Sequence, residues 1–144
     1  MDLAAVELVS SILDSNYRIL QISQSTGEKP AALEHVISEM VILKAVLEES
    51  IAMLGSLVSP APGPAEVALK QCAALASILS IKVGELTDKF SSARTMRLAA
   101  TVTWTRQKEE ISERLSAFRD SVTLLRQITA EYVKQLPGRV VLGI

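Results

Sequence analysis

Residues 110–129 read EEISERLSAFRDSVTLLRQI, and the apolar side chains in this stretch recur at alternating steps of four and three residues. The series consists of Ile111, Leu115, Phe118, Val122 and Leu125. Such spacing puts one apolar stripe along an α-helix. Seven residues before Ile111 lies Trp104, the only tryptophan, in the same phase of the stripe. The pattern predicts a long helix from about residue 96 to residue 135 that packs against other helices.

Three more helices are predicted upstream, at about residues 2–22, 30–57 and 65–90. The second of these carries an apolar seam that includes Leu43 and Leu47. Breaks separate the helices: SQSTGEKP after the first, the proline-rich SPAPGP at residues 59–64, and the weaker SSARTM before the last. Pro and Gly punctuate helices in this way because Pro suits the first turn and Gly the position after the last.

The predicted fold class is therefore all-α: a four-helix, mainly antiparallel bundle, with room for one extra short helix. Residues 1–136 form one helical domain in this prediction. Residues 137–144 form an apolar tail or the start of a linker. A chain of 144 residues that is 49% hydrophobic is long enough to build a core without disulfides or metals.

Composition limits the function classes. The formal net charge is −1 and aromatic residues make up 3% of the chain, so the basic excess and stacking residues of a nucleic-acid binder are absent. The single cysteine permits no internal disulfide, which fits a cytoplasmic location. The first residues, MDLAAVELVSS, lack the basic start of a signal peptide. The most apolar windows contain charged residues, so no membrane-spanning segment is expected.

The first helix is unusually apolar around its circumference. Opposite Glu7 and Asp14 lies an arc wider than half of the helix surface, wider than a simple surface helix shows. The candidate membrane or partner face consists of Leu3, Val6, Leu8, Val9, Ile12, Leu13, Ile19 and Leu20, with Leu3 at the polar edge near the tip. We expect this face to be buried in the resting bundle. Asn16 lies within the arc and is expected to be a hydrogen-bonded core amide.

No group of residues suggests catalysis, a cofactor or a metal. No glycine-rich phosphate loop is present, and the lone His35 has no ligand partners at suitable spacing. Cys72 falls on an apolar seam and is expected to be a buried thiol. The acidic residues Glu109, Glu110 and Glu113 lie on a solvated helix face, whereas catalytic carboxylates need a pocket that shifts their pKa. We therefore expect no enzyme and no small-molecule substrate.

The layout resembles the HeLo-like N-terminal domain of fungal STAND (NLR-like) proteins. Three stretches carry the resemblance: MDLAAVELVSSILDSNYRIL, VISEMVILKAVLEESIAML and TWTRQKEEISERLSAFRDSVTLLRQI. The middle of the chain departs from that pattern, with the proline-rich SPAPGP and with LAATVT before the tryptophan. The resemblance implies a helical signalling domain that assembles homotypically or with a related helical domain. It also implies action at membrane lipids in programmed cell death or incompatibility.

Two other interpretations remain open from the sequence. The regular stripe of the last helix would also suit a structural dimerisation or adaptor module without membrane activity. A small-molecule carrier or enzyme built on a helical bundle is the third and least favoured class.

Overall fold

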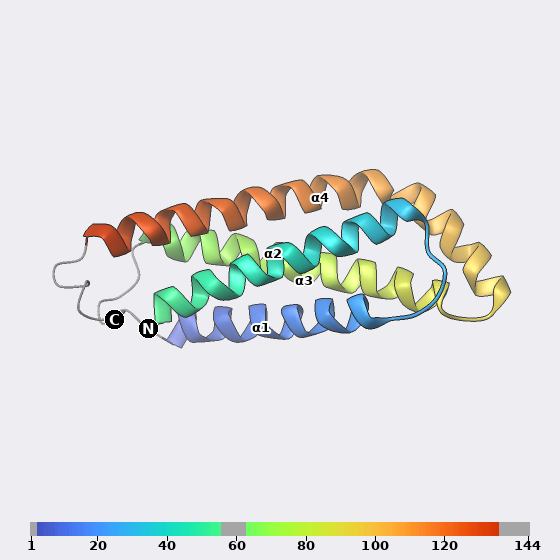
Figure 1. Cartoon of the computed structure of the whole chain (residues 1–144), viewed down its shortest axis with the longest axis horizontal. Helices are drawn as coiled ribbons and strands as arrows, with labels where there is room; N and C mark the ends of the chain where they lie inside the picture. The colour runs from blue at the N-terminus through green and yellow to red at the C-terminus, as the bar shows by residue number, and fades with distance from the viewer. Residues whose placement is uncertain (1–2, 56–62, 136–144) are drawn as a thin grey trace.

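The computed structural model describes residues 3–55 and 63–135, with side chains from residue 6 onward, and these ranges form four α-helices (Figure 1). They are α1 (Leu3–Gln24), α2 (Ala31–Gly55), α3 (Gly63–Phe90) and α4 (Arg94–Gln135). The all-α four-helix prediction is confirmed. Within the described ranges there is no extra short helix. The predicted tail and most of the SPAPGP segment lie outside the described residues.

Consecutive helices run antiparallel, but helices that are neighbours in space are not always consecutive in the chain. Helix α1 packs on α3 and α2, and α4 packs on α3 and α2. Figure 1 shows that α1 and α3 run in one direction while α2 and α4 run in the other. The neighbouring pairs α1–α3 and α2–α4 are thus parallel, and α2 is diagonal to α3. The bundle is two antiparallel hairpins laid side by side.

The core lies along α3, which contacts both α1 and α4. Four of its alanines are buried, Ala65, Ala68, Ala73 and Ala76, and their small side chains let neighbouring backbones approach closely. All eight residues of the predicted core seam are buried: Leu43, Leu47, Trp104, Ile111, Leu115, Phe118, Val122 and Leu125. Because the core needs side chains from both hairpins, neither hairpin can bury its apolar surface alone.

The β-branched run at the start of α4 is helical. Thr101, Thr103 and Thr105 each donate a side-chain hydrogen bond to the carbonyl oxygen four residues earlier, at 3.0, 3.0 and 2.9 Å. These local bonds give the hydroxyl groups partners inside the helix. Helix α4 begins at Arg94, two residues before the predicted start.

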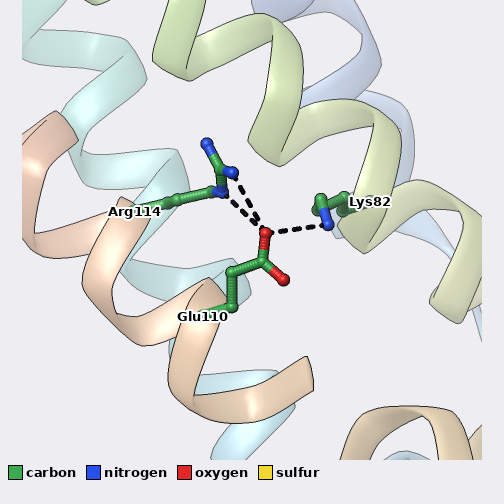
Figure 2. A network of polar contacts seen from close by, with 3 residues as sticks. All are labelled: Lys82, Glu110 and Arg114. Carbon is green, nitrogen blue, oxygen red and sulfur yellow. Dashed lines mark hydrogen bonds and ion pairs between the residues drawn. The ribbon is translucent and has the colours of Figure 1, made fainter. Parts of the chain in front are cut away.

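Two polar contacts tie α4 to the rest of the bundle. Glu110 Oε1 accepts hydrogen bonds from Lys82 Nζ on α3 at 3.1 Å and from Arg114 Nη2 at 3.0 Å (Figure 2). Hydrogen bonds from Lys82 and Arg114 lower the pKa of Glu110 below its ordinary value of 4.5. On the other side, Arg119 pairs with Glu39 of α2.

The turn after α1 is fixed by a glycine. Gly27 has φ of +124°, and a Cβ atom there would lie 3.1 Å from Ser91 Oγ, in the α3–α4 connection. Ser91 Oγ donates a hydrogen bond to the Thr26 carbonyl at 2.8 Å. The two connections at this end of the bundle are thereby joined.

The two glycines Gly84 and Gly27 should respond oppositely to alanine. At Gly84 in α3, a Cβ would lie 3.5 Å from Ile22 Cδ1, which is an ordinary contact. We expect Gly84→Ala to raise the free energy of unfolding by up to about 1 kcal/mol, the usual helix-interior difference. Gly27→Ala should lower it, because alanine resists a positive φ. Urea denaturation would measure both, and a loss of stability in Gly84→Ala would contradict the α1–α3 packing.

The Glu110 network should make stability depend on pH. Its lowered folded-state pKa means that the ionised carboxylate stabilises the fold above pH 4.5, and that this contribution is lost as pH falls through the folded-state pKa. We expect Glu110→Gln to lower the thermal midpoint slightly at pH 7 and to match wild type well below pH 4. Glu113→Gln, at an exposed position on the same helix, is the control. An equal effect of both variants at pH 7 would argue against the network.

Candidate functional site

The outer face of α1 carries a regular stripe of exposed apolar side chains. Val6, Leu13, Tyr17 and Leu20 are 50%, 49%, 62% and 39% exposed. At about 100 degrees per residue they fall within about 60 degrees of one another. Ser10 and Gln24 complete steps of four and three residues along the same line. This is the spacing with which one helix packs against another, yet none of the helices in the described ranges covers it.

The inner face of α1 faces the core. Ile12, Ile19 and Ile22 are buried, while Leu8 and Val9 are half-buried and pack against the core. The expectation that the whole arc is buried in the resting bundle is therefore wrong for Val6, Leu13 and Leu20. The arc is too wide for the two neighbours that α1 has, so its far side stays in solvent. The side chain of Leu3 lies outside the described side chains.

Asn16 differs from its prediction. Its side chain is 2% exposed, but neither Oδ1 nor Nδ2 has a hydrogen-bond partner in the described part of the chain. The expected hydrogen-bonded core amide is therefore not found, because apolar side chains dominate the inner face of α1. An unpartnered buried amide costs about 1–3 kcal/mol, so Asn16 weakens the docking of α1.

A cavity of about 340 Å³ lies between the last turns of α1 and the second half of α3. Its lining includes Arg18, Ile22, Gly84 and Thr87. The buried Thr87 Oγ1 and the Arg18 Nε atom have no partner among the described residues. The α1–α3 contact thus leaves buried polar atoms without hydrogen-bond partners, whereas Lys82 and Glu110 form an ion pair across the α3–α4 contact.

The first turns of α4 form a second exposed surface, which we call the α4 arm (residues 94–108). Figure 1 shows it projecting past the start of α2 at the end of the bundle where α1 ends. Leu98 and Val102 are 63% and 53% exposed and lie on one face. The arm contains four cations and no acidic residue: Arg94, Arg97, Arg106 and Lys108. In the described structure none of these four forms an ion pair.

The residues considered for chemistry are separated in the structure. Burial raises the pKa of the Cys72 thiol to about 12, so the reactive thiolate is strongly disfavoured. His35 is exposed and lines a groove of about 540 Å³ between α2 and α4 with Trp104 and the Arg119–Glu39 pair. Among the described residues, no group of three or more His, Cys, Asp or Glu side chains is placed to hold a metal ion. The strongest candidate site is therefore a surface, the stripe on α1.

Helix α3 is long and apolar enough to cross a membrane, judged by length and composition within the described residues. The expectation that no segment of the chain spans a membrane stays a prediction. The composition of α3 follows from its position, because a helix that packs on α1 and α4 at once needs apolar residues on two sides. Core helices of this kind and membrane spans share the same composition, so the feature is weak evidence for a span.

Sequence reasoning found three of the four stripe residues but missed Tyr17 and the α4 arm. The seven-residue repeat from Val6 to Leu13 to Leu20 was available, and adding Tyr17 would have separated the outer stripe from the inner one. The arm had a signal as well: its four cations stand without an acid between residues 94 and 108.

Comparison with protein-family models, with curated proteins and with solved structures gave no match. The resemblance to HeLo-like domains stays a prediction from the sequence, and the surface of α1 provides the structural basis for a function.

Proposed function

We propose that this chain is a helical interaction module that assembles with copies of itself through the exposed stripe of α1. One observation supports this above the others: a folded helix presents Val6, Leu13, Tyr17 and Leu20 to solvent at coiled-coil spacing. Scattered exposed apolar residues need no explanation, but a continuous stripe is typical of an interaction surface.

The finer proposal follows the family resemblance. We propose an N-terminal signalling or effector domain of a fungal NLR-like receptor, located in the cytoplasm and recruited to membranes on activation. Assembly through α1 would supply the oligomeric signal in programmed cell death or incompatibility. The alternative is an adaptor or dimerisation module with the same assembly surface and no membrane activity.

Leu13→Glu tests the assembly surface. Leu13 is 49% exposed, so the substitution should change the free energy of unfolding by less than about 0.5 kcal/mol. It puts a charge in the middle of the stripe, and we expect it to abolish self-association in sedimentation velocity. Ile42→Glu on α2 is the matched control, since Ile42 is 63% exposed and lies on another helix. Self-association that survives Leu13→Glu would exclude the α1 stripe as the assembly surface.

Membrane action is favoured by a separate observation, the weak docking of α1. A released α1 would expose the inner residues Ile12, Ile19 and Ile22 in addition to the outer stripe. A helix apolar on both faces can bury that surface at a bilayer. The unpartnered Asn16 lowers the free energy needed for release.

Asn16→Leu separates release from assembly. The substitution replaces an unpartnered buried amide with a side chain of the same branching, so we expect a gain in stability of about 1 kcal/mol. If release of α1 is required, Asn16→Leu should slow dye leakage from anionic vesicles while leaving self-association unchanged. Asn16→Asp, which buries a charge, should lower the free energy of unfolding. If wild type causes no leakage, or if wild type and Asn16→Leu cause equal leakage, the proposed release of α1 at membranes is contradicted. The adaptor function would then be the better proposal.

A further inference from the structure

We infer that the α1 stripe of one copy binds the α4 arm of a second copy, so that assembly is head-to-tail. This inference rests on the proposed self-association and names the surface that receives α1. The two surfaces differ in charge and lie at different places on the bundle, and both are open to solvent.

Both surfaces carry a row of exposed side chains at steps of four and three residues along a helix. On α1 the stripe is a single row one side chain wide. On the arm, Leu98 and Val102 are exposed with Thr105 next in line, at steps of four and three residues. Two helices with such rows can pack lengthwise with their side chains interleaved.

The charges beside the two rows are opposite. Glu7 and Asp14 lie on one flank of the α1 stripe, and both are exposed. Arg94, Arg97 and Lys108 lie on one flank of the arm, within about 60 degrees of one another by helical geometry. Among the described residues, none of these five side chains forms an ion pair.

Three nearby charges partly offset this contrast, and one of them is the exposed Glu109 directly after the arm. Arg18 follows Asp14 by one turn, but it is half-buried and lines the cavity between α1 and α3, where it donates to Ser15 Oγ at 3.5 Å. Glu28 lines the groove beside Arg94 and Arg97, together with Lys29. Each surface keeps its sign: the flank of α1 is acidic and the arm is basic.

Pairing of α1 with α1 is the competing arrangement, and charge disfavours it. In an antiparallel pair the flank with Glu7 and Asp14 would meet the same flank of the other copy. In a parallel pair it would have to meet the opposite flank, where Val9 and Asn16 already pack into the bundle. Like charges brought together repel each other, so the arm is the better receiver.

The positions of the two surfaces determine the form of the assembly. The stripe runs along α1, and the arm lies on a different helix and projects at the end of the bundle where α1 ends (Figure 1). Each copy can therefore use both surfaces at once. A head-to-tail contact of this kind can continue from copy to copy and grow into a ring or a filament.

A charge exchange in the full chain tests the inference. One variant carries Glu7→Lys and Asp14→Lys, and the other carries Arg94→Glu and Arg97→Glu. We expect each alone to self-associate at least about tenfold more weakly than wild type in sedimentation velocity. Mixed in equal amounts, the two should recover assembly, because each lysine-bearing α1 meets a glutamate-bearing arm and each native α1 meets a native arm. Glu113→Lys with Arg126→Glu, exposed elsewhere on α4, is the control and should change little.

The outcomes separate this inference from the proposed function. If Leu13→Glu abolishes assembly but the Arg94→Glu, Arg97→Glu variant assembles normally, α1 is the surface and the arm is not its receiver. Failure of the mixture to recover, with both variants folded by circular dichroism, also overturns the head-to-tail contact. A wild-type chain that stays monomeric at all accessible concentrations would overturn the proposed self-association as well.

Discussion

The structure depends on α3 being packed on two sides. Its small residues let α1 and α4 approach together, and its larger ones, among them Leu79, Val83 and Leu86, fill the space between them. A helix in that position must be apolar over much of its circumference, which gives it the composition of a membrane span. Each of the four helices packs mainly on two others, and each, α3 included, keeps one face in water.

The two neighbours of α3 are held differently. Helix α4 contributes a long series of buried side chains, and the Glu110 network reinforces it from outside the core (Figure 2). Helix α1 contributes fewer buried residues and includes Asn16, whose amide finds no partner. Helix α4 is therefore held in the bundle more strongly than α1, and α1 is the helix that carries the exposed stripe. Low local stability is expected of elements that move or exchange partners.

Much of the fold could be predicted because the apolar period is strong and the breakers are clear. The 4–3 steps from Ile111 to Leu125 placed α4, and Gly27, Pro30 and the proline-rich segment placed the other breaks. Period alone does not reveal how many neighbours a helix has. The width of the α1 arc was visible, but which half faces the core depends on where α2 and α3 lie. Whether the Asn16 amide finds a partner, and whether the start of α4 projects from the bundle, likewise depends on tertiary packing.

The side-by-side arrangement of two hairpins has a consequence for folding. Contacts within each hairpin, α1 with α2 and α3 with α4, are close in sequence. The contacts between hairpins join residues much farther apart, 62 positions for Ile22 and Gly84 and 80 for Glu39 and Arg119, and such separation slows folding. We expect hairpins to form early and their docking to limit the rate. Until docking is complete, the hydrophobic side of α3 that faces α1 is open to solvent. A second molecule present at that moment could supply the missing hairpin, so dilution should matter to the yield of refolded monomer.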